Sequence, residues 1–144
     1  MKIITLLLSV LMIAVFAAGC TTAPKNEPFI HREWLLISYN GTARHELTAK
    51  PARIDLSQKS EGKLQKGVAE LGCSRIQFTY KPDGDGNFRI RSFEEFPSSC
   101  ENNDREKAMI RTLSQSRKFM LTGHYILLTD ADGNTLKCIA ADWD

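Results

Sequence analysis

The first 20 residues hold the feature that most restricts what this chain can fold into. Lys2 is followed by an uncharged, apolar run over residues 3–16, and the small residues 17–19 lead directly to Cys20. This order is typical of a bacterial lipoprotein leader, which is cleaved before the cysteine after a diacylglyceryl group is attached to its sulfur. An uncleaved membrane anchor would also explain the apolar run, which nearly spans a bilayer, but such an anchor does not need the cysteine. We therefore expect a lipoprotein signal peptide over residues 1–20 and lipidation of Cys20.

The remainder of the chain has the size of one domain. Residues 21–144 are 124 residues, enough for a hydrophobic core but too few for two domains. Residues 21–30 are rich in polar residues and proline, so we expect a flexible tether there and a single domain over residues 31–144. The full chain has a formal net charge of +2 with both signs mixed. Such a surface gives no reason to expect nucleic acid as a partner. We also expect the protein to be a monomer.

Alternating apolar residues predict antiparallel strands joined by tight turns. Ile76, Phe78 and Tyr80 share one face of a strand, and polar side chains occupy the other face. Stretches rich in glycine, aspartate and asparagine then mark the turns, because these residues tolerate the backbone angles that turns require. Strands are expected over residues 34–39, 52–57, 74–80, 88–90, 125–128 and 136–140.

One helix is expected from residue 103 onward. Asn103 can cap its first turn, and Glu106 can reach back to the Asn103 amide as in a capping box. Met109, Ile110 and Leu113 then fall on one face. Strands, one helix and further strands in this order predict an α+β fold with an antiparallel sheet rather than repeated β-α-β units.

Three cysteines belong to the domain, in a compartment that oxidises thiols. Cys73 precedes an alternating strand and Cys100 precedes the helix, so a disulfide between them would join the start of the helix to the sheet. Closing this 28-residue loop would stabilise the fold by roughly 3–4 kcal/mol. Cys138 shares a strand face with Leu136 and Ala140, and we expect it to be buried and unpaired. The alternative is that all three thiols are unpaired core residues.

A metal site is not expected. Asp83, Asp85 and Asn87 match the first ligand positions of a calcium loop, but Phe88 stands where glycine is required, and the flanking residues alternate as strands do. A solvated hairpin tip explains the same residues. The cysteines lack the spacing of a zinc site, and no histidine stands at ligand spacing from them.

Candidate catalytic residues are also better explained in other ways. Glu94 and Glu95 are adjacent on a strand, so their side chains point to opposite faces and do not share a site. His31, His45 and His124 are far apart in sequence, and no nucleophile motif accompanies them. We therefore expect no catalytic residue and no cofactor.

Four segments between Trp34 and the C-terminus match the pattern of a known family. They are the strand start Trp34-Leu35-Leu36, the turn Gly72-Cys73-Ser74, Cys100 before the helix with Phe96 and Ser98 in place of Thr and Met, and an ending spaced as Gly123, Ile126, Leu128, Asp130, Gly133 and Leu136. In these segments the domain resembles the META/HslJ family of small envelope lipoproteins and secreted domains.

The resemblance implies a curved antiparallel sheet, like a cracked barrel, that wraps one helix. It also implies an envelope protein without established enzymatic activity, in a family associated with heat shock, antibiotic tolerance or secretion. Because Thr21 rather than Asp follows Cys20, we expect the lipid anchor in the outer membrane, with the domain facing the periplasm.

For function we expect a non-enzymatic lipoprotein that binds an envelope protein partner or supports envelope integrity and stress tolerance. The surfaces expected to meet a partner are the sheet–helix cleft and the loop from Phe96 to Asn103. Two alternatives stay open: a carrier of lipid or a small molecule in the sheet–helix cleft, and an inhibitor of a secreted hydrolase.

Overall fold

The computed structural model describes residues 29–143 except residue 61. The expected signal peptide, Cys20 and most of the expected tether lie outside this part of the chain. None of the helices in the described part is long and apolar enough to cross a membrane.

Within residues 29–143, nine strands form a single antiparallel sheet in the order β6-β5-β4-β3-β1-β9-β8-β7, with the short β2 paired to β1. The strands are β1 (Glu33–Tyr39), β2 (Thr42–Ala43), β3 (Arg53–Asp55), β4 (Gln65–Leu71), β5 (Ser74–Pro82), β6 (Phe88–Pro97), β7 (Ser116–Thr122), β8 (Tyr125–Asp130) and β9 (Thr135–Ala140). The helices are α2 (Arg44–Leu47), α3 (Asp104–Ser114) and the short 3-10 helix η2 (Ala141–Trp143).

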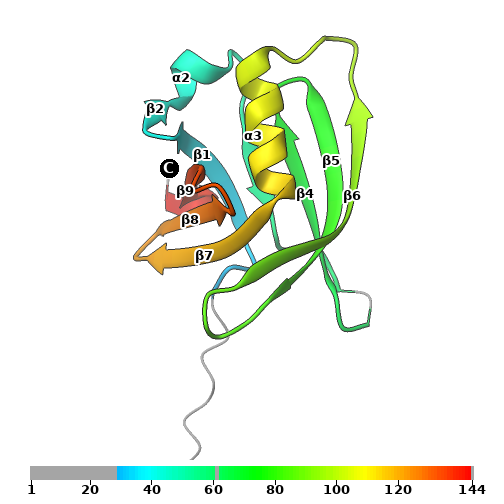
Figure 1. The fold of residues 1–144 in the computed structure, drawn as a ribbon, viewed down its shortest axis with the longest axis vertical. Coiled ribbons are helices and arrows are strands. Elements are labelled where there is room, and N and C mark those ends of the chain that lie inside the picture. The colour runs from blue at the N-terminus through cyan, green and yellow to red at the C-terminus, as the bar shows by residue number, and fades with distance from the viewer. Residues whose placement is uncertain (1–28, 61, 144) are drawn as a thin grey trace, which may run out of the picture.

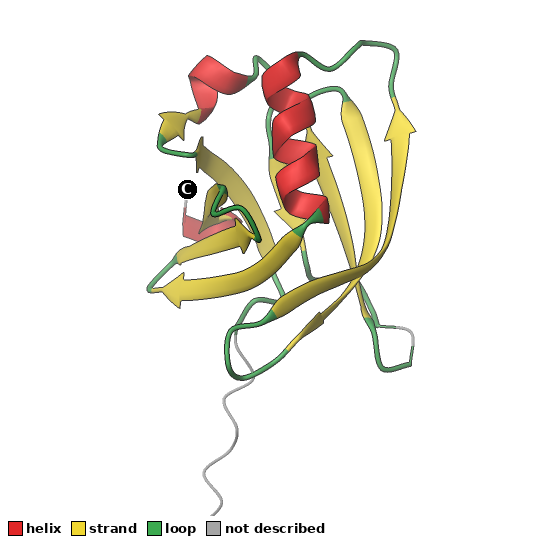
Figure 2. Cartoon of the chain, viewed as in Figure 1, coloured by secondary structure: helices red, strands yellow, loops and turns green. Residues whose placement is uncertain are grey.

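The sheet curls into a half-barrel, and α3 lies across the opening between its two halves (Figures 1 and 2). The first and last strands in this order, β6 and β7, meet at one end of the barrel. There Asn87 and Lys118 form an isolated bridge, and the Phe119 amide donates to the Gly86 carbonyl at 2.8 Å. The expected α+β fold, a curved antiparallel sheet packed around one helix, is confirmed.

The core starts earlier in the chain than the sequence indicates. The side chain of Ile30 is fully buried, and its carbonyl accepts a hydrogen bond from Trp34 Nε1 at 2.9 Å. The last residue of the expected tether, Ile30, thus belongs to the core. Phe29 and Ile30 are two adjacent apolar residues at the edge of a polar stretch and show no periodicity, so the burial of Ile30 could not be read from the sequence.

Helix α3 begins at the expected cap and packs on the inner face of the sheet. Met109 and Leu113 are fully buried and Ile110 nearly so. Thr112 Oγ1 donates to a carboxylate oxygen of Asp130 at 3.1 Å, which ties the helix to the turn between β8 and β9.

Candidate functional site

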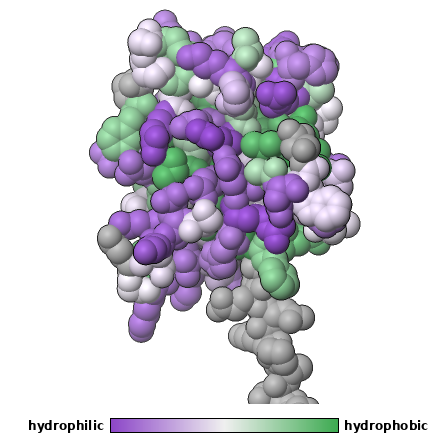
Figure 3. Space-filling view, turned by 180° about the vertical axis from the view of Figure 1, so that it is seen from behind, coloured by the Kyte–Doolittle hydropathy of each residue, from purple (hydrophilic) through white to green (hydrophobic). Residues whose placement is uncertain are grey.

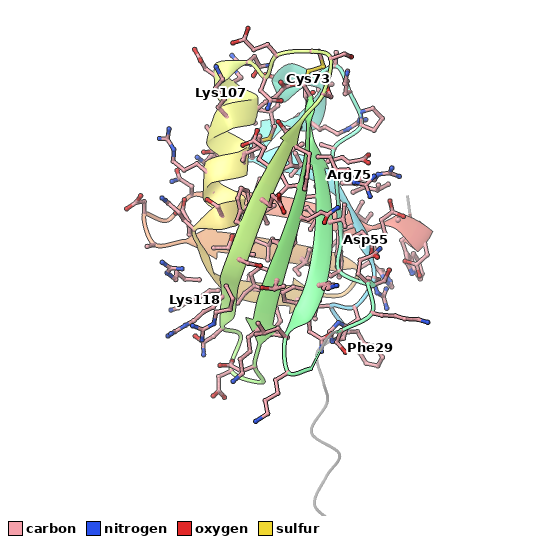
Figure 4. All side chains as sticks on the ribbon, turned by 90° about the vertical axis from the view of Figure 1, so that its right-hand side faces the viewer. Phe29, Asp55, Cys73, Arg75, Lys107 and Lys118 are labelled. Carbon is pink, nitrogen blue, oxygen red and sulfur yellow. A yellow bond between two sulfur atoms is a disulfide. The ribbon has the colours of Figure 1, made fainter. Side chains whose placement is uncertain are left out.

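The turn between β4 and β5 meets the start of α3 at one end of the sheet, where Figure 4 labels Cys73. Gly72 adopts φ +68°, a left-handed conformation that glycine accepts without strain. A Cβ at this position would collide with the side chain of Glu106. Glycine therefore serves two purposes here, because it permits the turn and leaves room for a buried carboxylate beside it.

A disulfide and one amide side chain fasten the loop before α3 to this turn. Cys73 is bonded to Cys100, the pair that the sequence favoured, with their Cα atoms 5.5 Å apart. Asn102 Oδ1 accepts from the Cys73 backbone amide at 2.7 Å, and its Nδ2 donates to Ser74 Oγ. Ser74 Oγ in turn donates to the carboxylate of Glu95. The loop thus has a covalent bond and a chain of hydrogen bonds to the sheet.

The predicted capping box forms and also recruits α2. Asn103 Oδ1 accepts from the Glu106 amide at 2.8 Å, while a carboxylate oxygen of Glu106 accepts from the Asn103 amide at 2.9 Å. Asn103 Nδ2 donates to the carbonyl of Leu47 in α2 at 3.2 Å. We call the side chains of Ser74, Glu95, Asn102, Asn103 and Glu106, with the disulfide, the helix-start cluster.

A shallow cavity of about 370 Å³ opens beside the disulfide. Lys50 lies at its rim, with Nζ 2.8 Å from Cys100 Sγ. Ser98 also lines it, and Ser99 and Glu101 are exposed on the same loop. The helix-start cluster therefore fixes the shape of a loop whose polar side chains face solvent.

The polar groups of the helix-start cluster are bonded to one another and to the backbone. The carboxylate of Glu106 is buried and accepts a backbone amide, and Glu95 accepts from a buried serine. Within the described part of the chain, no buried side-chain nitrogen or oxygen lacks a hydrogen-bond partner. Groups bonded in this way hold a backbone in place, and sequence reasoning missed the burial of Glu106 because a capping box also forms with an exposed glutamate.

The three histidines are not brought together. The Tyr80 hydroxyl lies 3.2 Å from His31 Nδ1 and donates to the Leu56 carbonyl at 3.0 Å. Burial, and secondarily the charge of Asp55, raises the pKa of Tyr80 well above its ordinary value. His45 is exposed, and its Nε2 lies 3.8 Å from a carboxylate oxygen of the next residue, Glu46. His124 stacks on Trp143, with ring centroids 3.5 Å apart.

The two adjacent glutamates lie on opposite faces of β6, as expected. Glu94 pairs across the sheet with Gln77, whose side chain is exposed, and Glu95 pairs with Ile76, which is fully buried. The larger surface cavity, about 660 Å³, lies over the β4–β6 surface and includes Gln77 and Glu94.

Two turns of similar sequence are built around an aspartate. The Asp83 carboxylate accepts from the amides of Asp85 and Asn87, and the bonds from Asn87 hold the pKa of Asp83 below its ordinary value. Asp130 is held in the same way by Asn134. Burial acts to raise the pKa of Asp130, but these hydrogen bonds outweigh it and lower the pKa. Across the described residues, no three His, Cys, Asp or Glu side chains are placed to hold a metal ion.

The space between α3 and the sheet is filled by side chains. Met109 and Leu113 are fully buried there, together with Leu128 and Leu136 of the facing strands. Cys138 is also in this core, unpaired, and burial raises the pKa of its thiol to about 12. The region between α3 and the sheet is therefore a packed core. A carrier of lipid or a small molecule would need an open apolar pocket there.

The family follows from a match that covers most of the chain. Residues 27–143 match the META domain family. The chain belongs to the META domain family. The matched residues include the disulfide, the helix-start cluster and every strand that the structure describes. The resemblance inferred from the sequence is confirmed. No curated protein matches the chain.

Solved structures share this fold at low sequence identity. One, an NMR structure, has a TM-score of 0.60 and 20% identity, and the match covers 78% of this chain and 92% of that one. An NMR structure of a protein from Burkholderia xenovorans has a TM-score of 0.56 and 18% identity, with 77% and 82% covered. A DUF4847 family protein from Bacteroides vulgatus has a TM-score of 0.54 and 14% identity, with 78% and 94% covered. At these identities the likeness concerns the fold alone.

Proposed function

We propose that this META domain protein is a lipid-anchored, non-catalytic component of the bacterial envelope that binds a protein partner. The observation that carries the proposal is the position of Cys20, directly after small residues at the end of an uncharged apolar run. The bond between Cys73 and Cys100 supports it, since such bonds persist in oxidising compartments such as the periplasm.

A binding role fits the local chemistry better than a catalytic one. A general acid or base needs a titrating group free to reach a substrate. Here Glu106 is committed to the capping box and Glu95 to Ser74, while the histidines stand apart. The disulfide-fastened loop instead presents Ser98, Ser99 and Glu101 to solvent in a fixed shape, which lowers the entropy cost of binding a partner.

Processing in cells tests the anchor. Cys20→Ala is expected to leave uncleaved precursor in the inner membrane, whereas the wild-type protein is shortened and fractionates with the outer membrane. Cys138→Ala removes a different unpaired thiol and is the matched control, which should be processed normally. Normal shortening and sorting of Cys20→Ala would contradict the proposal.

Partner capture and phenotype test the non-catalytic role. Replacing Ser98, Ser99 and Glu101 together by alanine should weaken cross-linking of the intact lipidated protein to its membrane partner. By contrast, single alanine substitutions on the two strand glutamates and the three histidines should leave any cellular phenotype nearly intact; the residues are Glu94, Glu95, His31, His45 and His124. Loss of a measurable turnover in one of these single variants, with the fold unchanged, would show that the protein is an enzyme.

A further inference from the structure

The outer face of β7, β8 and β9 has an unusual composition. Its outward-facing side chains, which we call the basic–apolar face, are Lys118, Met120, Thr122, Tyr125, Leu127, Thr129, Thr135, Lys137 and Ile139. Four are apolar or aromatic, two are lysines, three are threonines, and none is acidic. Strand pairing makes the apolar members contiguous, since Met120 is opposite Leu127 and Tyr125 is opposite Ile139. The row continues to Leu35 of β1, which is opposite Ile139.

These side chains are accessible, and neither lysine has an acidic partner among the residues that the structure describes. Met120 is 58% exposed and Tyr125 is 40% exposed. Lys137 Nζ lies 5.0 Å above the Tyr125 ring, and neither Lys137 nor Lys118 forms an ion pair with any described residue. Large exposed apolar side chains next to unpaired cations are the arrangement that binds the boundary between anionic headgroups and acyl chains.

The other half of the sheet has a different outer surface. On β3, β4 and β5 the outward residues form ion pairs with one another, with Arg53 contacting Glu33 and Glu70, and Arg75 also contacting Glu70. The rear of the molecule is largely hydrophilic, with hydrophobic side chains only in small separate patches (Figure 3). The ion-paired surface of β3–β5 thus differs from the basic–apolar face, on which no outward-facing side chain is acidic.

The point at which the described chain begins, Phe29, brings the basic–apolar face within reach of a membrane. Phe29, where the described chain begins, is 76% exposed. Figure 4 shows Phe29 and Lys118 in the lower part of the domain, away from Cys73 and Lys107 at the other end. Only the eight residues 21–28 separate Phe29 from Cys20, and they span at most about 28 Å when fully extended. Neighbouring strands are about 4.8 Å apart, so Tyr125 lies about 10 Å from Leu35 of the entry strand.

We propose that the basic–apolar face rests on an anionic phospholipid surface and sets the orientation of the domain on the membrane. The inference rests on the proposed lipid anchor, which holds the domain near the bilayer but does not orient it. Met120, Tyr125, Leu127 and Ile139 enter the headgroup boundary, and Lys118 and Lys137 lie near lipid phosphates. The helix-start cluster, at the other end, then faces away from the membrane, where a protein partner can reach it.

Hydroxyl-radical footprinting of the lipidated mature protein in vesicles tests this orientation. Met120 and Tyr125 are the reporters, and Phe96 is the internal control because its exposure, 39%, matches the 40% of Tyr125. In phosphatidylcholine vesicles containing phosphatidylglycerol, oxidation of both reporters should slow roughly five-fold relative to detergent, with Phe96 unchanged. In vesicles of phosphatidylcholine alone, protection should largely disappear, because each lysine near an anionic surface contributes roughly five-fold in partitioning.

Charge reversal supplies the matched variants. The pair Lys118→Glu and Lys137→Glu should abolish protection in the anionic vesicles, whereas Arg105→Glu with Lys107→Glu on α3 should leave it unchanged. Unaltered Phe96 oxidation reports that each variant is folded. Equal protection in both kinds of vesicle, or protection that survives reversal of both face lysines, would overturn the inference.

The remaining outcomes separate this inference from the proposed function. Mass spectrometry of the same preparation measures the mass of the N-terminal peptide. An unlipidated Cys20 contradicts the proposed function and with it the orientation. A lipidated Cys20 with unprotected reporters overturns the orientation alone. Protection that appears only when an acidic envelope protein is added also overturns it, and identifies the face as a protein-binding surface.

Discussion

Gly72→Ala should destabilise the domain more than an ordinary glycine substitution at positive φ. An alanine at φ +68° costs about 1 kcal/mol for the left-handed backbone alone. Its Cβ would also displace the buried Glu106 side chain, which accepts the Asn103 amide. Loss of that reciprocal bond of the capping box costs about 1 kcal/mol more. We therefore expect a decrease of about 2 kcal/mol in the free energy of unfolding.

Gly41→Ala is the matched control. Gly41 also has positive φ, +81°, but a Cβ there would meet nothing within 4 Å. It should therefore cost only the backbone contribution, about 1 kcal/mol. Urea unfolding of the two variants and the wild type, followed by circular dichroism, measures both values. The difference between the variants reports the contact between residue 72 and Glu106.

A double-mutant cycle decides whether the contact is the cause. In a Glu106→Ala background the collision is absent, so Gly72→Ala should cost only about 1 kcal/mol, as Gly41→Ala does. An undiminished cost of Gly72→Ala in that background would refute the assignment of Gly72 to the packing of Glu106.

Three further predictions concern the disulfide, the buried thiol and acid stability. Replacing Cys73 and Cys100 by serine should lower the free energy of unfolding by roughly 3–4 kcal/mol without changing processing; non-reducing peptide mapping that links either residue to Cys138 would contradict the pairing. Cys138 should resist alkylation at neutral pH until urea unfolds the protein, because it is fully buried and its pKa is raised to about 12. The lowered pKa of Asp130 gives stability that is present above about pH 4 and lost as the pH falls through the folded-state pKa. Asp130→Asn should therefore reduce the change of the urea unfolding midpoint between pH 4 and 2. An unchanged pH dependence in this variant would show that the Asp130 carboxylate is not its source.

Elements that depend on local chemistry were predictable from the sequence. The α3 start followed from Asn103 and Glu106, which bond to each other within one helical turn. The turns were expected at residue types that tolerate positive φ, and Asn40 and Gly41 both adopt positive φ in the turn after β1. The alternation in β5 identified a strand because its inner face is almost entirely buried.

Elements whose sequence conflicts with local preference were missed. β4 contains Gly67, which weakens a strand by itself, but the Phe78 ring of the neighbouring strand lies against it and leaves no room for a side chain. β7 begins with Ser116, Arg117 and Lys118, and its buried Phe119 follows only after these polar residues. In both strands the stabilising contacts come from the neighbouring strand of a hairpin, which periodicity within one segment does not reveal.

The helix-start cluster was predictable only in pieces. Cys73 and Cys100 could be paired because each stands just before an expected element. Asn102 was missed because its role depends on a turn 29 residues earlier, where it accepts the Cys73 amide. The burial of Glu106 depends on the absence of a side chain at Gly72, and only the folded structure places the two together.

Acylation of Cys20 is the property on which the proposed envelope role most depends, and the intact mass of the mature protein tests it directly. The protein purified from membranes should begin at Cys20 and carry the added mass of a diacylglyceryl group, with or without a third acyl chain on the new N-terminus. A mature chain that retains Met1, or that begins at another residue without lipid, would contradict the anchor and the membrane orientation together.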